Sequence, residues 1–292
     1  MPRCRWFLPG RTRCLRSAMP NVEDYLLGTD DTESVRLGVQ HRLWAVQAAA
    51  IWERAGIEPG SRVLDVGCGP GYAAADIAQL IGPGGRLLGV DGSPEYVAQF
   101  ADRMDRLGFS HAEVRKGDVH NIASIAGDEA GTFDVAYIRW GLSFSKDPDR
   151  LIEQVHKCLK PGGRVAIQDY FGYASIKLAP KNADFQRGIA AVAEYWTEHG
   201  DLDVMGEMPR ILRETGFEVR EFEVVQRLAR PGNQIWNWPD IFWPSFIPRV
   251  VEAGYLTRAE ADAFMAAWRS ASASPDSFLL LPPVFEAIGV KR

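Results

Sequence analysis

The sequence of 292 residues lacks the features that mark membrane, metal-binding and disulfide-rich proteins. It has no run of about 18 apolar residues, the length that spans a bilayer, and its N-terminus has no apolar signal-peptide segment. The four cysteines form no CxxC pair and no cluster with histidine, so they indicate neither a zinc site nor a disulfide framework. We therefore expect a soluble, cytoplasmic protein without a metal site or a membrane span.

Acidic residues are missing from positions 1–18, which contain five arginines. The whole chain carries a net charge of −5, so the remainder is acidic and offers no general attraction to nucleic acid or anionic lipid. We interpret residues 1–18 as a basic, disordered tail. A transit segment and an upstream start codon, with Met19 as the natural first residue, stay open as alternatives.

Short apolar segments alternate with helical patterns from residue 59 onward. Strands of this kind, separated by helices, favour a parallel sheet that is covered on both faces. We predict an α/β fold: a Rossmann-like, doubly wound, mostly parallel sheet of seven strands. The predicted strands cover residues 62–67, 86–91, 112–118, 133–140, 164–171, 217–225 and 277–285.

Helical segments before and after these strands divide the chain further. Residues 30–56 are predicted to form one helix, whose apolar stripe comprises Val39, Leu43, Val46 and Ala50. The later insertions follow ligand-binding strands and indicate a cover over a substrate. The predicted parts are the tail at 1–18, an N-terminal helical cap at 19–58, a cofactor-binding core at 59–171, and the remainder of the sheet at 172–292 with substrate-covering helical insertions at 172–201 and 230–275.

The stretch VLDVGCGPGYAA, residues 63–74, places three glycines between a predicted strand and a helix start. Glycine lets the backbone turn sharply and approach a ligand, and the free N–H groups of a helix start favour negative ligand atoms. Gly67, Gly69 and Gly71 do not complete the dinucleotide pattern G-x-G-x-x-G, because Tyr72 takes the place of its third glycine. A nicotinamide-dependent oxidoreductase is therefore disfavoured.

Three aspartates end three successive predicted strands. Asp91 is placed to accept hydrogen bonds from two ribose hydroxyls. Asp118 is placed to accept from an exocyclic purine amine, while the backbone N–H of Val119 serves a ring nitrogen. Asp65 suits an ammonium group. Together they describe a ligand with an amine, a ribose and an adenine, and without a pyrophosphate.

This arrangement resembles the class I S-adenosylmethionine-dependent methyltransferases. It is most similar to their small-molecule branch, which includes ubiquinone and menaquinone methyltransferases. The resemblance implies S-adenosylmethionine as cofactor and S-adenosylhomocysteine as product. The matching segments occur in family order over residues 61–170 and read VLDVGCGPG, LLGVDGS, KGDVH, FDVAYIRWGL and LKPGGRVAIQDY.

The resemblance also implies roles for single residues. Asp65 would lie near the amine of the cofactor's methionine part, and Arg139 near its carboxylate. Gln40 could reach the same end from the cap. The cofactor-binding residues that the resemblance implies are Asp65, Gly67, Cys68, Gly69, Asp91, Gly92, Ser93, Asp118, Val119 and Arg139.

Catalytic residues are less clearly marked. His120 follows the adenine segment and is a candidate general base, or a histidine that merely lines the pocket. His199 is an equal candidate if its segment folds over the site. Asp169 and Tyr170 end the fifth predicted strand and could orient an acceptor.

We predict transfer of a methyl group to an O, N or C atom of a small, partly apolar or aromatic metabolite. Trp140, Trp236 and Trp243 are candidates for the substrate wall, with lid packing as the alternative. A non-catalytic S-adenosylmethionine-binding or scaffold protein is a second reading, and a nucleic-acid methyltransferase a third. An amino-methylating DNA enzyme would carry an Asn/Asp-Pro-Pro-aromatic motif where this chain reads IRWG, so we expect no nucleic-acid partner.

Overall fold

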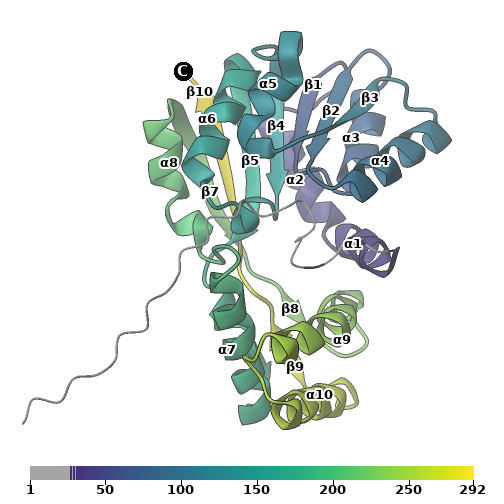
Figure 1. Cartoon of the computed structure of the whole chain (residues 1–292), viewed down its shortest axis with the longest axis vertical. Helices are drawn as coiled ribbons and strands as arrows, with labels where there is room; N and C mark the ends of the chain where they lie inside the picture. Colours follow the sequence, from purple (N-terminus) through teal and green to yellow (C-terminus); the bar gives the residue numbers. More distant parts are fainter. Residues whose placement is uncertain (1–26, 28, 30) are drawn as a thin grey trace, which may run out of the picture.

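A computed structural model describes residues 27, 29 and 31–292 of the chain. Its centre is a seven-stranded sheet in the order β3-β2-β1-β4-β5-β10-β7. The first five strands pair in parallel, while β10 pairs antiparallel with both β5 and β7 (Figure 1). The predicted doubly wound, mostly parallel sheet is confirmed. Its strands are β1 (Arg62–Val66), β2 (Arg86–Asp91), β3 (Ala112–Lys116), β4 (Phe133–Arg139), β5 (Leu159–Tyr170), β7 (Phe217–Val225) and β10 (Val284–Lys291).

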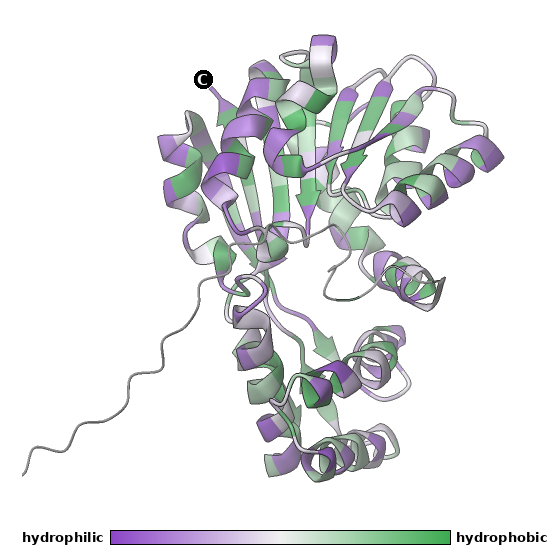
Figure 2. Cartoon of the chain, viewed as in Figure 1, coloured by the Kyte–Doolittle hydropathy of each residue, from purple (hydrophilic) through white to green (hydrophobic). Residues whose placement is uncertain are grey.

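Different helices cover the two faces of the sheet. Successive residues of a strand point to opposite faces, so Leu64 and Val66 join the apolar cluster with α5, α6 and α8, while Val63 joins the cluster with α2, α3 and α4. Figure 2 shows hydrophobic residues running along the strands of this sheet. The helices are α2 (Ala45–Ala55), α3 (Tyr72–Ile81), α4 (Pro94–Leu107), α5 (Ile122–Ala126), α6 (Pro148–Cys158) and α8 (Met208–Glu214).

The sheet brings the carboxyl ends of three neighbouring strands to one edge. Strand β1 lies between β2 and β4, and Asp65 is in register with Gly89 on one side and Tyr137 on the other. Because all three strands run in the same direction, Asp65, Asp91 and Arg139 come at the same edge of the sheet. Ligands of open α/β sheets bind at this edge.

A second lobe, comprising β6, β8, β9, α7, α9 and α10, lies below that edge in Figure 1. Its three strands form a separate small sheet in the order β6-β9-β8, which the sequence did not predict. Aromatic side chains including Phe185, Trp243 and Phe264 fill a core of its own. The elements are β6 (Lys177–Ala179), α7 (Ala183–Thr197), β8 (Leu228–Ala229), α9 (Asn237–Glu252), α10 (Arg258–Ser272) and β9 (Phe278–Leu280).

The prediction of a single last strand is wrong, because the end of the chain forms two strands in different sheets. Instead of one strand over 277–285, residues 278–280 belong to the small sheet and residues 284–291 to the central sheet. Pro282 and Pro283 separate the two, because proline cannot donate a backbone hydrogen bond to a neighbouring strand. The segment therefore links the two lobes.

The cap helix corrects a second prediction. The chain forms α1 (Asp31–Leu43) and α2, interrupted at Trp44, and Val46 of the predicted apolar stripe is 77% exposed. The buried face of α1 instead carries Glu33, Arg36 and Gln40. This face is polar because α1 packs against α9 and α3 rather than on the sheet, so apolar periodicity is a poor guide here.

Two further predictions from the sequence concern the N-terminal segment and membrane-spanning helices. Residues 1–18, and the part of the predicted cap that precedes residue 27, lie outside the described residues. Within the part of the chain that the structure describes, none of the helices combines the length and the apolar character that a membrane crossing requires.

Candidate functional site

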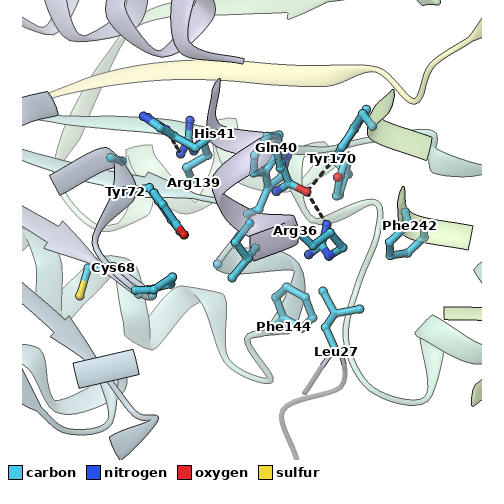
Figure 3. A pocket seen from close by; sticks show the side chains of 18 of the residues that line it. Leu27, Arg36, Gln40, His41, Cys68, Tyr72, Arg139, Phe144, Tyr170 and Phe242 are labelled. Atoms are coloured by element: carbon cyan, nitrogen blue, oxygen red, sulfur yellow. Dashed lines mark hydrogen bonds between the residues drawn. The ribbon is translucent and has the colours of Figure 1, made fainter. Parts of the chain in front are cut away.

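A cavity of about 270 Å³ lies at the carboxyl ends of β1, β2 and β4. The loop of residues 67–71, called the glycine loop below, lines the cavity together with residues of α1 and α9. The cavity is therefore enclosed by the sheet, the cap and the second lobe. Figure 3 shows Cys68 and Tyr72 on one side of it and Phe242 on another, with Arg36 and Gln40 between. The side next to the glycine loop is polar, and the side next to α9 is aromatic.

The glycine loop leaves open space beside its backbone. Gly69 has a φ of +53°, a conformation that other residues rarely adopt, and an added Cβ there would meet nothing within 4 Å. Gly71, with a φ of +81°, is bare for a different reason, because a Cβ would approach the ring of Phe100 to 2.7 Å. Gly69 thus gives a ligand access to the backbone, while Gly71 allows helix α3 to pack against Phe100.

Asp91 is fixed at the tip of β2 by backbone hydrogen bonds. Its Oδ2 accepts from the N–H of Gly69 at 2.8 Å, and its Oδ1 accepts from the N–H of Ser93 at 2.9 Å. Burial raises the pKa of Asp91, and these backbone hydrogen bonds oppose the rise. Each carboxylate oxygen has a second lone pair, and the residue lines the cavity, so the group is held ready to accept further hydrogen bonds.

Asp65 and Arg139, at the carboxyl ends of β1 and β4, each have a buried polar atom without a partner among the described residues. Asp65 is 3% exposed, and its Oδ2 has no hydrogen-bond partner among the described residues. Burial raises the pKa of Asp65 to about 7, although the charge of Arg139 opposes the rise. The Nη1 of Arg139 is also buried without a partner in the described chain. Since buried polar groups are almost always satisfied, a ligand with both an ammonium and a carboxylate would fit.

His41 on α1 orients Arg139. Its Nδ1 accepts a hydrogen bond from Arg139 Nη2 at 2.8 Å, so its Nε2 carries the proton and donates to Asp76 Oδ2 at 2.9 Å. Burial lowers the pKa of His41, and the hydrogen bond to Asp76 opposes this. Tyr72, the residue that breaks the dinucleotide pattern, stacks on His41 with ring centres 6.4 Å apart. It therefore belongs to the wall of the cavity.

The residues expected at the ribose and the adenine divide into two groups. Gly92 and Val119 line the cavity, but Ser93 and Asp118 do not. Ser93 caps α4 by accepting from the N–H of Tyr96. Asp118 Oδ1 accepts from the N–H of His120 at 2.9 Å and lies 2.7 Å from its Nδ1. Burial alone would raise the pKa of Asp118, but the hydrogen bonds from His120 outweigh it and lower the pKa.

The aromatic side of the cavity includes a residue in an unusual backbone conformation. Trp140 has a φ of 51°, in the left-handed region that non-glycine residues rarely occupy. Its ring stacks on Tyr170 with centres 6.3 Å apart and on Trp238 with centres 6.0 Å apart. Such strained residues concentrate at functional sites. Further aromatic residues of this side are Phe144, Tyr173, Trp196, Phe242 and Trp243.

The structure separates the predicted substrate residues. Trp140 and Trp243 line the cavity, whereas Trp236 does not. Trp236 stacks on Trp268 with ring centres 4.3 Å apart, and its indole N–H donates to Ser272 Oγ at 3.1 Å. It is part of the packing of the second lobe.

Of the four catalytic candidates, only Tyr170 lines the cavity. His199 is exposed, and its Nδ1 is 2.9 Å from the carbonyl oxygen of Tyr195. His120 lies beside the cavity lining, where its Nε2 is 2.8 Å from Ser145 Oγ. Asp169 is buried beneath the site, and its carboxylate accepts from the backbone N–H groups of three residues. These are Leu142, Ser143 and Tyr170.

Sequence reasoning missed Arg36, His41 and Trp238, which all line the cavity. A signal was present for the first, because Glu33, Arg36 and Gln40 are spaced three and four residues apart and so share one helix face. His41 lies next to that face. Trp238 had the same appearance as its neighbours in an aromatic segment, and only the packing of α9 distinguishes it.

Comparisons with known proteins agree with this fold. A family model described as a methyltransferase domain matches residues 57–216, more than half of the chain. The arsenite methyltransferase of Aquipseudomonas alcaligenes is 35% identical over 184 residues, which cover 58% of this chain and 51% of that protein. The ubiquinone/menaquinone biosynthesis C-methyltransferase of Hydrogenovibrio crunogenus is 27% identical over 203 residues, covering 62% and 74%.

A solved structure shows the same fold. Phosphoethanolamine N-methyltransferase 2 of Haemonchus contortus, in complex with S-adenosyl-L-methionine, gives a TM-score of 0.56 at 20% identity, covering 94% of this chain and 60% of that chain. The open α/β sheet, with a glycine loop at the carboxyl ends of its strands, places the chain among proteins with the Rossmann-like fold. The match to the methyltransferase-domain model identifies the family. The chain belongs to the methyltransferase-domain family. It spans about half the length of the arsenite methyltransferases that it matches.

Proposed function

We propose that the protein is an S-adenosylmethionine-dependent methyltransferase that acts on a small, partly apolar or aromatic acceptor. The observation that carries the proposal is the unsatisfied pair of Asp65 and Arg139 beside the glycine loop. Asp65 Oδ2 and Arg139 Nη1, both buried and without a partner among the described residues, fit the ammonium and carboxylate of a methionine moiety. Asp91, at the next strand tip, is placed for a ribose.

The residues of the chain would hold and orient the two reactants. When bound, S-adenosylmethionine would supply an electrophilic methyl group for the acceptor, and S-adenosylhomocysteine would be the product. The enzyme's main tasks are alignment and exclusion of water. Asp65, Arg139 and Asp91 would fix the cofactor, and the aromatic side would enclose the acceptor. A proton lost by the acceptor can pass to water.

Arsenite, the substrate named for two relatives, is not part of the proposal. Arsenic in this form binds soft thiolate ligands. Among the described residues, Cys68 is the only cysteine that lines the cavity, and burial holds its pKa well above the usual value. The proposed acceptor is therefore organic. On the acidic composition of the chain we also propose that it has no nucleic-acid partner. A cytoplasmic location is proposed on the absence of any CxxC pair or disulfide framework in the sequence.

A non-catalytic cofactor-binding protein is the second candidate. The fold does not exclude it, because the [4+2]-cyclase SpnF, which is not named as a methyltransferase, has a similar fold, with a TM-score of 0.53 at 21% identity and covering 84% of this chain and 80% of that chain. Fold alone does not determine the reaction. Binding of S-adenosylmethionine without methyl transfer to any aromatic acceptor would favour this candidate over the enzyme.

Calorimetric titration tests the cofactor half of the proposal. We expect the protein to bind S-adenosylmethionine and not NADH. Asp65→Asn should weaken binding by about 100-fold, because it leaves a ligand ammonium without its counter-charge. Asp128→Asn is the matched control, since Asp128 is exposed and distant from the cavity lining. Equal affinities of the two variants, or binding of NADH in place of S-adenosylmethionine, would contradict the proposal.

A further inference from the structure

Gln40 presents a hydrogen-bond donor to the cavity in a fixed orientation. It lies on α1, is 8% exposed and lines the cavity. Its Oε1 accepts from Arg36 Nη1 at 2.8 Å and from Trp238 Nε1 at 2.9 Å. Both lone pairs of the amide oxygen are thereby used. Its hydrogen bonds with the described residues all use Oε1, so its Nε2, which carries two N–H groups, is available to a ligand.

The neighbours of Gln40 prevent the amide from turning over. Arg36 is held by Glu33 through two hydrogen bonds of 2.7 and 2.6 Å, so its guanidinium group is fixed and its charge is balanced. A rotated amide would direct its NH₂ group at two other donors, the guanidinium and the indole. The orientation in which the oxygen faces Arg36 and Trp238 is therefore the stable one. Figure 3 shows Gln40 and Arg36 side by side at the cavity, joined by a hydrogen bond.

The surrounding walls fit a flat molecule. Trp140 and Trp238 are nearly parallel, with an interplanar angle of 26°, and Tyr170 lies at 24° to Trp140. Aromatic side chains prefer to stack with other flat groups in this way. Gln40 is joined directly to this wall, because its partner Trp238 is one of the stacked residues.

The charges around the cavity do not suit a cation. Asp65 and Asp91, both at the cofactor side, are the only acidic residues among those that line it in the described chain. The protein's own cations already lie over two aromatic rings: Arg139 is 5.0 Å from the centre of Trp140, and Arg36 is 5.5 Å from the centre of Phe242. An ammonium ligand would meet these guanidinium groups without a carboxylate of its own.

We infer that Gln40 is a specificity-determining residue, and that the acceptor is an uncharged planar molecule with an oxygen that receives a hydrogen bond from Gln40 Nε2. This inference rests on the proposed function and narrows its substrate class. The amide binds and orients the acceptor through a carbonyl or hydroxyl oxygen. Gln40 is a positioning residue, because neither of its amide atoms reacts.

Three probes that share a naphthalene ring test the inference: 2-naphthol, naphthalene and 1-naphthylmethylammonium. Each is titrated into the full chain saturated with S-adenosylhomocysteine, and binding is followed by calorimetry. We expect 2-naphthol to bind about tenfold more tightly than either of the others, since one hydrogen bond to a fixed donor contributes on that order. Preference for the ammonium probe, equal binding of 2-naphthol and naphthalene, or no binding of any probe would overturn the inference.

Gln40→Glu is the discriminating variant, because it keeps an oxygen for Arg36 and Trp238 and replaces only the donor. The preference for 2-naphthol over naphthalene should fall about tenfold, and the ammonium probe should gain affinity. Trp238→Phe removes one of the two groups that fix the amide and should reduce the preference by a smaller factor. Circular dichroism verifies that each variant is folded, and an unchanged preference in folded Gln40→Glu would overturn the inference.

Failure of the proposed function gives a different result. Wild-type protein that does not bind S-adenosylhomocysteine contradicts the cofactor assignment. The probe titrations repeated without S-adenosylhomocysteine then still decide whether Gln40 selects an oxygen-bearing planar ligand.

Discussion

His41 accepts a hydrogen bond of 2.8 Å from Arg139, and this contact joins the cap helix α1 to the end of β4. A histidine accepts through an unprotonated ring nitrogen, so the contact requires neutral His41. The second nitrogen of His41 is bound to Asp76 at 2.9 Å, which fixes the ring. The cap thereby determines where the free Nη1 of Arg139 points.

Replacing His41 tests this positioning role. We expect His41→Leu to weaken S-adenosylmethionine binding about tenfold, because Arg139 loses the acceptor that orients it. His41→Gln should restore most of the affinity, since its amide oxygen can accept from the guanidinium. Calorimetry on both variants is the measurement. If leucine and glutamine have the same effect, His41 acts through packing alone.

The raised pKa of Asp65 predicts that cofactor binding depends on pH. Burial raises this pKa to about 7 in the free protein, and an ammonium ligand requires the ionised carboxylate. Binding should therefore release a proton below about pH 7, and affinity should fall as the pH falls through that value. Calorimetry in buffers of different ionisation enthalpy measures the released proton.

Asp65→Asn serves as the control for that experiment. Its remaining binding should release no proton near pH 7. Proton release that persists in the variant would assign the titration to another group of the cavity lining, such as His41 or Asp91.

Much of the cofactor half follows from sequence because its residues are set by the chain's local geometry. Asp65 and Asp91 end strands whose apolar runs are unmistakable, and the parallel order of those strands brings their tips together. Gly69 is recognisable because the turn demands it. These positions depend on a few consecutive residues and on one topology.

The acceptor half depends on contacts between distant segments, and sequence patterns do not report these. Trp236 and Trp238 are alike in sequence, but one packs inside the second lobe and the other reaches Gln40, which is 198 positions away. The polar face of α1 contradicts the apolar stripe because α1 covers a cavity and not a sheet. The contacts of this face of α1 could therefore be assigned only from the folded structure.

The two tryptophans provide a matched pair of substitutions. Trp236→Phe should leave the affinity for 2-naphthol within about twofold, since Trp236 does not line the cavity, and should cost about 1 kcal/mol of folding free energy through the lost hydrogen bond and stacking. Trp238→Phe should lower the affinity for 2-naphthol. Chemical denaturation measures the folding free energy, and calorimetry measures the affinity for 2-naphthol. If Trp236→Phe lowered this affinity and Trp238→Phe did not, Trp236 would be a substrate-contacting residue after all.

Asp65 also predicts a conflict between stability and binding. Its pKa is 3.8 in the unfolded chain and about 7 when folded, so the folded state binds a proton that the unfolded state releases between these values. Stability contributed by this group is present below about pH 4 and is lost as the pH rises through 7. Above pH 7 the folded, ligand-free protein therefore contains an unfavourable buried carboxylate.

Removing that charge should stabilise the ligand-free protein. We expect Asp65→Asn to melt higher than wild type at pH 8, by at least the roughly 2–4 °C that about 1 kcal/mol produces in a large domain. At pH 4 the difference should disappear, because Asp65 is then protonated in the folded state. Differential scanning calorimetry at both pH values measures it. A variant that is less stable than wild type at pH 8 would show that the ionised carboxylate has a stabilising partner, and the assignment of its Oδ2 to a ligand ammonium would lose its basis.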